Sequence, residues 1–162
     1  MSVTLARIDD RLIHGQIVHA WIEYSKAKHL LIADDFASTD KTSQLMLRLA
    51  APKTIKLVIL SLEKTINYIK EYENEPIFLI VRNPENMLRL LNLGLVLSDI
   101  NLGNISMTKS QTGRKMLLKN IHVEQNDVDC LKAIAEKGVY IYIKLVPDER
   151  SIDAIDLINK KY

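Results

Sequence analysis

The sequence predicts an α/β fold: a single domain whose central, mostly parallel β-sheet carries helices on both faces. Short apolar runs alternate with longer amphipathic stretches, which is the pattern of repeated strand–helix units. Several of the runs are almost continuous in Val, Ile and Leu, as expected for strands that helices cover on both sides. The length of 162 residues, without a repeat or a linker-like segment, predicts one domain over residues 1–162.

Seven segments have the composition of strands. They are short, rich in β-branched and apolar residues, and bounded by polar or turn-forming residues. In chain order the expected strands are Val3–Ile8, His29–Ala33, Lys56–Leu60, Ile77–Val81, Ser98–Leu102, Lys115–Val123 and Val139–Val146.

The segments between these strands carry signals for the beginning and end of helices. Asn83 followed by Pro84 predicts a cap and first turn, and Gly94 ends that helix after Leu93. The other expected helices run from Ser38 or Thr39 to Ala51, from Ser61 to Tyr72, from about Asn126 to Gly138, and from Ser151 to Lys160. In the first of these, Leu45, Met46 and Leu49 are expected to face the core.

The first helix begins where the first strand ends. Its apolar residues recur at helical spacing and predict a buried stripe of Ile13, Ile17, Val18, Trp21 and Ile22. His14 lies at the first turn, directly before Gly15. Open α/β sheets bind ligands at the carboxyl ends of their strands, so we expect His14 at that edge.

The composition narrows the possible functions. Lys and Arg outnumber Asp and Glu by only 22 to 20, without a run of like charges, so a nucleic-acid partner is not expected. Cys130 is the only cysteine, which excludes an intrachain disulfide and fits a reducing, cytoplasmic setting. The N-terminus does not resemble a secretory signal, and the apolar runs are far shorter than the ~18 residues of a membrane span.

Ionisable side chains are concentrated between the first strand and the first helix. Arg7, Asp9, Asp10, Arg11 and His14 all fall within this connection. A neutral imidazole, with an ordinary pKa of about 6.5, is a competent nucleophile near neutral pH. The sequence therefore indicates a histidine that accepts a phosphoryl group, although a structural turn of caps and solvated ion pairs would use the same residues.

The neighbours of His14 suit this chemistry. A phosphoryl group carries about −1.5 to −2 charges, and free backbone N–H groups at the start of the helix would face it. Arg7 and Arg11 are expected to bind its oxygens, because arginine forms bidentate contacts with phosphate. Asp9 or Asp10 is expected to hold the other ring nitrogen and fix the tautomer. His29 and His122 lie in strand-like segments without clustered partners, so no function is expected of them.

Other classes of site fit the same segment less well. A dinucleotide site needs a glycine-rich turn after the first strand, and only Gly15 is present. A two-component receiver needs an acceptor aspartate after the third strand, where this chain has Ser61. A divalent metal on Asp9, Asp10 and His14 would be opposed by the two arginines. A non-catalytic regulatory domain that binds phosphoryl or anionic ligands remains the alternative from another class.

The segment from Arg7 to Gln16, Arg-Ile-Asp-Asp-Arg-Leu-Ile-His-Gly-Gln, resembles the signature of the IIB component of the bacterial sugar phosphotransferase system, mannose/fructose/sorbose family. The resemblance covers nearly the whole chain. It continues through Ala50-Ala51-Pro52, Arg82-Asn83-Pro84-Glu85, Asn101-Leu102-Gly103 and Val146-Pro147-Asp148.

The resemblance implies a phosphoryl relay. A IIA protein or domain would donate to Nδ1 of His14, and the chain would then phosphorylate a sugar held by the IIC and IID membrane components. Arg7 and Arg11 would neutralise the phosphoryl oxygens. Neither step requires a metal or an organic cofactor. Such a protein is cytoplasmic and associates peripherally with the permease, and the sugar is selected by the membrane components.

One stretch departs from the family pattern. Many members have Asn-Val-Gly-Gly where this chain has Asn101-Leu102-Gly103-Asn104, and the following residues also differ. We expect the stretch 103–114 to form a polar, mobile loop at the rim of the site, without a catalytic role for Ser106, Thr108 or Thr112.

Overall fold

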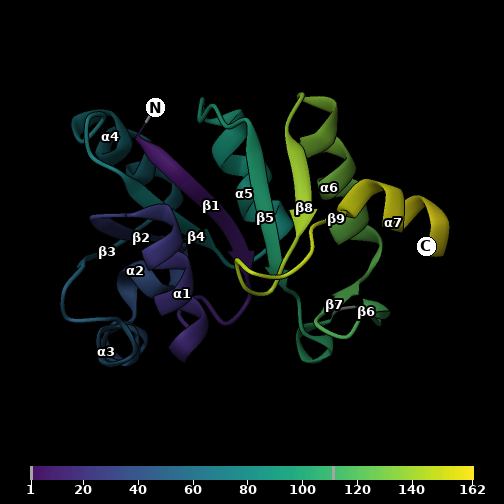
Figure 1. Ribbon diagram of the computed structural model, residues 1–162, viewed down its shortest axis with the longest axis horizontal. Coiled ribbons are helices and arrows are strands. Elements are labelled where there is room, and N and C mark those ends of the chain that lie inside the picture. Colours follow the sequence, from purple (N-terminus) through teal and green to yellow (C-terminus); the bar gives the residue numbers. More distant parts are fainter. Residues whose placement is uncertain (1, 111) are drawn as a thin grey trace.

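The computed structural model describes residues 2–110 and 112–162 and has the predicted α/β fold (Figure 1). A seven-stranded sheet has the strand order β3-β2-β4-β1-β5-β8-β9, and its pairings are parallel except that of β8 with β9. Its strands are β1 (Val3–Asp9), β2 (His29–Ala33), β3 (Lys56–Leu60), β4 (Ile77–Val81), β5 (Asp99–Asn104), β8 (Tyr140–Ile143) and β9 (Ile152–Asp153).

Helices cover both faces of this sheet, as predicted (Figure 1). One core cluster joins the sheet to α1 (Gly15–Ser25), α2 (Asp35–Thr39) and α3 (Lys41–Ala50). The other joins it to α4 (Leu62–Glu71), α5 (Pro84–Asn92), α6 (Gln125–Glu136) and α7 (Ala154–Lys161). Because β2 and β4 lie between these layers, every one of their residues is buried. None of the helices described is long and apolar enough to cross a bilayer.

The helix expected from Ser38 or Thr39 to Ala51 is two helices, which corrects the prediction. Asp34 caps α2 and Asp40 caps α3, each accepting a hydrogen bond from a backbone N–H of the first turn. The hydroxyl groups of Ser38 and Thr39 instead donate back to carbonyl groups within α2. The carboxylate of Asp40 starts a new helix at the point where a continuous one was expected.

A second correction concerns the segment expected as one strand over Lys115–Val123. It folds as the antiparallel hairpin of β6 (Lys115–Leu118) and β7 (Ile121–Val123), outside the main sheet. The polar pair Lys119-Asn120 forms its turn. The strand expected over Val139–Val146 likewise ends at Ile143, and the chain then bends into the loop that leads to β9.

The apolar residues expected on the core face of α3 are exposed. Leu45, Met46 and Leu49 face solvent, whereas Leu47 points into the core. The helical spacing correctly placed these apolar residues on one side of α3, but that side does not face the sheet. The exposed side chains are therefore a surface feature of α3.

His29 has clustered partners, contrary to expectation. It is buried at the beginning of β2, where its two ring nitrogens contact the hydroxyl of Tyr68 and the carboxylate of Glu75. Its ring also packs against Tyr72. These contacts lie at the amino end of the sheet, opposite to His14, and give His29 a structural role.

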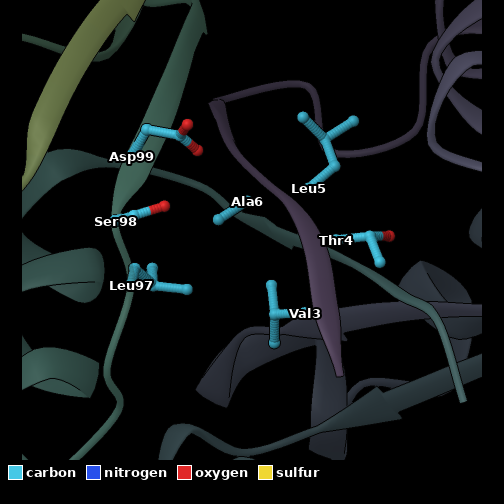
Figure 2. A pocket seen from close by; sticks show the side chains of 7 residues that line it. All are labelled: Val3, Thr4, Leu5, Ala6, Leu97, Ser98 and Asp99. Carbon is cyan, nitrogen blue, oxygen red and sulfur yellow. The ribbon is translucent and has the colours of Figure 1, made fainter. Parts of the chain in front are cut away.

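The two central strands diverge at their amino ends. β1 pairs with β5 from Arg7–Asn101 onward. Before that point Val3, Ala6 and the residues leading into β5 surround a cavity of about 20 Å³ (Figure 2). This is room for about one water molecule, so this cavity is too small for a ligand.

The carboxyl ends of the parallel strands meet at the opposite edge. Asp9 ends β1, Asp34 follows β2, Arg82 follows β4 and Asn104 ends β5. In Figure 1 this is the edge where the arrowheads of β1 and β5 converge. Polar side chains from distant parts of the sequence are thereby brought around the segment that contains His14.

Candidate active site

The loop between β1 and α1 has an unusual backbone conformation. Leu12 has a φ of 59° and Gly15 a φ of 45°, so left-handed residues lie on both sides of His14. For a residue such as Leu12 this conformation costs about 1–2 kcal/mol. It is retained because the Leu12 side chain is buried and its N–H donates to the carbonyl of Asp9 at 2.9 Å. Strain of this kind is characteristic of functional sites.

His14 occupies the N-cap position of α1 and is exposed. The helices α3, α4, α5 and α7 begin with Asp40, Ser61, Asn83 and Asp153, and each of these side chains accepts a backbone N–H. The helix α6 begins with a capping box, in which Asp127 accepts the backbone N–H of Glu124. The side chain of His14 forms no such bond, and the first turn of α1 contains no acidic residue. Of the first N–H groups of α1, that of Ile17 donates to the carbonyl of His14 at 3.2 Å, and those of Gly15 and Gln16 are open to an anion beside the imidazole.

Asp9 is the centre of the charged cluster. Its buried carboxylate accepts hydrogen bonds from Nε and Nη2 of Arg11, both at 3.1 Å, and from Nη2 of Arg7 at 3.0 Å. It also accepts the backbone N–H of Arg11 at 3.0 Å. The side chain of Arg11 remains 30% exposed, so one edge of its guanidinium faces solvent. Arg11 lies three residues before His14, in the same loop.

Arg7 is placed differently from the prediction. It is 1% exposed, and its guanidinium donates to Asn101, to the carbonyl of Lys144 and to Asp9. It also lies 5.5 Å from the ring centroid of Trp21. Burial lowers the pKa of Arg7 from its ordinary value, and the ion pair with Asp9 acts in the opposite direction. Arg7 is thus a buried partner of Asp9, whereas the prediction had placed its guanidinium beside the phosphoryl group.

Gly103 provides the space that Arg7 occupies. The pairing of β1 with β5 shifts between Ile8 and Asp9, which leaves Gly103 as the extra residue of a bulge. A Cβ atom on Gly103 would lie 2.1 Å from Cζ of Arg7. The position therefore requires glycine because a guanidinium group fills the place of its side chain.

Asp10 is anchored in another direction. Its carboxylate accepts hydrogen bonds from Nδ2 of Asn104 at 2.8 Å and from both the backbone N–H and the hydroxyl of Ser106. The carbonyl of Asp10 accepts Nη1 of Arg82 at 3.4 Å. Arg82 in turn forms a bidentate ion pair with Asp34. The site loop is therefore attached to the ends of β5, β4 and β2.

These contacts correct the predicted role of the aspartates. Among the residues described, the hydrogen bonds of Asp9 and Asp10 go to other groups and neither carboxylate holds the imidazole of His14. Their hydrogen bonds fix the loop in which His14 stands. The described part of the chain also contains no group of three or more His, Cys, Asp or Glu side chains placed to hold a metal ion.

The structure adds residues to the site for which no role was predicted. Asn101, Asn104, Ser106 and Arg82 contact the charged cluster directly. Arg82, Asn104 and Ser106 follow or end a strand, and position at a carboxyl end was the available signal for them. Asn101 lies within β5, where it pairs with Arg7 of β1. The described part of the 103–114 stretch is also attached, since Arg114 binds Asp127 and the carbonyl of Ser106. It is not the free polar loop that was expected.

The family model for the PTS system sorbose subfamily IIB component matches residues 3–162. The chain belongs to this family. The sorbose-specific EIIB component of Klebsiella pneumoniae is 31% identical to this IIB component over 162 residues, 99% of this chain and 97% of that protein. The resemblance recognised in the segment from Arg7 to Gln16 is thereby confirmed.

Solved structures and longer relatives agree with this assignment. The IIBSor domain of the sorbose permease from Klebsiella pneumoniae matches this IIB component with a TM-score of 0.92 at 30% identity, over 100% of this chain and 99% of that one. The mannose-specific EIIAB component of Escherichia coli (strain K12) is 25% identical over 162 residues. That match covers 99% of this chain but 49% of the EIIAB protein.

Proposed function

We propose that this IIB component, acting as one domain over residues 1–162, is a phosphocarrier with His14 as its phosphoryl acceptor. A IIA protein or domain donates the phosphoryl group, and a sugar held by the IIC and IID permease components receives it. This makes the chain a protein-phosphohistidine–sugar phosphotransferase that works in the cytoplasm beside the permease. The existence of an EIIAB relative, in which a IIA unit shares the polypeptide, supports the choice of donor.

The observation that carries the proposal is the exposed His14 at the uncapped beginning of α1. Nδ1 of the neutral imidazole attacks the phosphorus, the N–P bond of the donor breaks, and the donor imidazole is released. In the second step a sugar hydroxyl attacks, the N–P bond on His14 breaks, and the proton of the hydroxyl is balanced by the one that the released imidazole of His14 takes up. The proposed steps need neither a metal nor an organic cofactor.

Charge stabilisation falls mainly to Arg11. The helix end contributes only about 0.3–1 kcal/mol at an exposed position, which is too little for a group of nearly two negative charges. Arg11 is already oriented by two hydrogen bonds to Asp9 and keeps an exposed edge. Arg7 donates a hydrogen bond to Asp9 from the protein interior and so keeps Asp9 in place. Its stabilisation of the phosphoryl group is therefore indirect.

The test is phosphorylation of the full chain, both by a phosphorylated IIA domain and by phosphoramidate, a small chemical donor. We expect an acid-labile, base-stable label on His14 that is lost in His14→Ala. His19→Ala is the matched control, because His19 is also exposed on α1 and should leave labelling unchanged. Full labelling of His14→Ala, or phosphate bound without a covalent bond, would instead indicate another acceptor or a regulatory anion-binding domain.

Arg11→Ala tests the role of the arginine. Hydrogen bonds to charged groups contribute about 1.5–3 kcal/mol, so labelling of His14 should slow roughly 10- to 100-fold. The variant should keep its fold, because the side chain is partly exposed and Asp9 retains Arg7. An unchanged labelling rate in a folded Arg11→Ala protein would remove Arg11 from the proposed mechanism.

A further inference from the structure

Four large apolar side chains form an exposed patch on α2 and α3. Phe36, Leu45, Met46 and Leu49 are 64%, 59%, 65% and 75% exposed. We call them the α2–α3 patch. Leu45 and Leu49 are one helical turn apart, with Met46 beside them, so they lie on one side of α3. Grouped exposed side chains of this size indicate an interaction surface more often than isolated ones do.

The patch lies at the same edge of the sheet as His14. The helices α2 and α3 follow the carboxyl end of β2 and pack into the same core cluster as α1. The inward side chains Ala37 and Leu47 belong to the same core cluster as Leu12 and Ile13, from the loop that carries His14. A protein seated on the patch would therefore contact the part of the molecule that presents His14.

Basic side chains outnumber acidic ones around the patch: the acidic Asp35 and Asp40 lie on its α2 side, where Asp35 pairs with Arg89 and Asp40 caps α3. Residues 41–62 include the exposed Lys41, Arg48 and Lys53, together with Lys56, and no acidic residue. An apolar centre with a basic rim complements an acidic surface, and such charges steer association and orient the partner. A donor that carries a phosphohistidine brings about −1.5 to −2 additional charges to the contact.

We propose that the α2–α3 patch is the docking surface for the IIA phosphoryl donor. This inference rests on the proposed function of His14. The complementary donor surface has an apolar centre and acidic side chains near its phosphohistidine. Obligate homodimer interfaces bury about 2,000 Å² or more, which four side chains cannot supply. They are sufficient for the centre of a transient contact below about 1,200 Å², as a carrier that must release its partner requires.

The test uses the full chain with a phosphorylated IIA domain that labels the unaltered protein. In the double variant Leu45→Ser/Leu49→Ser we expect KM for that donor to rise at least about tenfold, with kcat nearly unchanged. Leu93→Ser/Val96→Ser is the matched control, because both residues are exposed and apolar but precede β5 at the opposite edge. The control should keep the KM of the unaltered protein.

A second variant tests the charges. Arg48→Glu/Lys53→Glu should raise KM for the donor in the same way, and this rise should diminish at high salt as the charges are screened. Labelling of His14 by phosphoramidate should be equal in all these variants, since a small donor needs no docking surface. If phosphoramidate failed to label His14 in the unaltered protein, this result would refute the proposed function and not the docking surface.

Two results would overturn the docking proposal. One is an unchanged KM in Leu45→Ser/Leu49→Ser, and the other is an equal rise of KM in the control. If the serine variant kept its KM and also lost self-association in sedimentation, or binding to phosphatidylglycerol vesicles, the patch would serve a second copy of the chain or a membrane surface.

Discussion

Arg7 and Arg11 bind the same carboxylate from very different surroundings. Arg7 reaches Asp9 from the interior and is surrounded by Asn101, the carbonyl of Lys144 and the ring of Trp21. Arg11 binds Asp9 from the solvent side. Since only Arg11 has an exposed edge, only Arg11 can turn toward a charge on His14 without leaving a buried site. The two arginines therefore have different roles, although each lies two residues from Asp9 in the sequence.

The support from Arg7 can be tested at Gly103. In Gly103→Ala the new Cβ would lie 2.1 Å from Cζ of Arg7, so the guanidinium has to leave its place between Asn101 and Asp9. Breaking a buried ion pair costs about 3–5 kcal/mol. We expect the free energy of unfolding, measured by urea denaturation, to fall by about that amount.

A double-mutant cycle provides the control for Gly103→Ala. In an Arg7→Ala background the space beside Gly103 is empty, so Gly103→Ala should cost less than about 1 kcal/mol there. Equal costs in the two backgrounds would show that strain of the bulge, and not displacement of Arg7, makes glycine necessary.

At the scale of elements, burial and capping could be predicted from sequence. The strands β2, β3 and β4 have the bounds expected from their apolar runs, because sheet cores select continuous β-branched and aliphatic residues. Asn83-Pro84 and Ser61 begin α5 and α4 as expected, since capping is local chemistry. Which side of α3 packs on the sheet could not be predicted. Helical spacing shows which residues share a side of the helix, but not whether that side faces the core or the solvent.

The site could be predicted only in its local part. Its position at the end of β1 followed from the order of strand and helix. The partners of the aspartates did not, because Asn104 lies 94 residues from Asp10, and Arg82 lies 72 residues from it. Only the register between β1 and its neighbours brings these side chains together. For the same reason the burial of Arg7 beneath Gly103 is invisible in the sequence.

Strand β8 has a consequence for stability at alkaline pH. Burial raises the pKa of Tyr142 to about 12, from an ordinary value near 10. Above pH 10 the unfolded chain loses this proton while the folded chain keeps it, so the unfolded state is favoured increasingly up to about pH 12. Stability should therefore be complete below about pH 10 and fall as pH rises from there to about 12.

The variant Tyr142→Phe isolates this contribution. It removes the titrating group and keeps the ring, so the urea midpoint should fall less between about pH 10 and 12 than in the unaltered protein. Lysine titration affects both proteins equally and cancels in the comparison. Tyr68, whose pKa burial also raises to about 12, keeps a similar loss in the variant. Identical pH profiles would show that Tyr142 ionises freely in the folded state.

At the scale of the whole molecule, one edge of the sheet carries both the loop of His14 and the proposed docking surface. The loop of His14 is attached to β5 through Asp10 and to β4 and β2 through Arg82 and Asp34. Asp34 also caps α2, the helix that carries Phe36 of the α2–α3 patch. The chemistry and the proposed docking surface are therefore adjacent but held by different contacts, and their effects on the reaction should be separable.

Arg82→Ala should separate them. The change frees the carbonyl of Asp10 and leaves Asp34 with its cap to Ala37 but without its ion pair. We expect stability to fall by about 1–3 kcal/mol, and labelling of His14 to slow by about tenfold because the loop is less well fixed. A loop defect acts after the donor has arrived, so phosphoramidate and the IIA domain should slow alike, through kcat. Serine variants of the patch should instead affect only KM for the IIA domain. Labelling rates measured with both donors, under conditions where the variant is fully folded, distinguish a loop defect from a docking defect. If Arg82→Ala raised only the KM for IIA, Arg82 would belong to the docking surface and the proposed division between holding the loop and receiving the partner would be wrong.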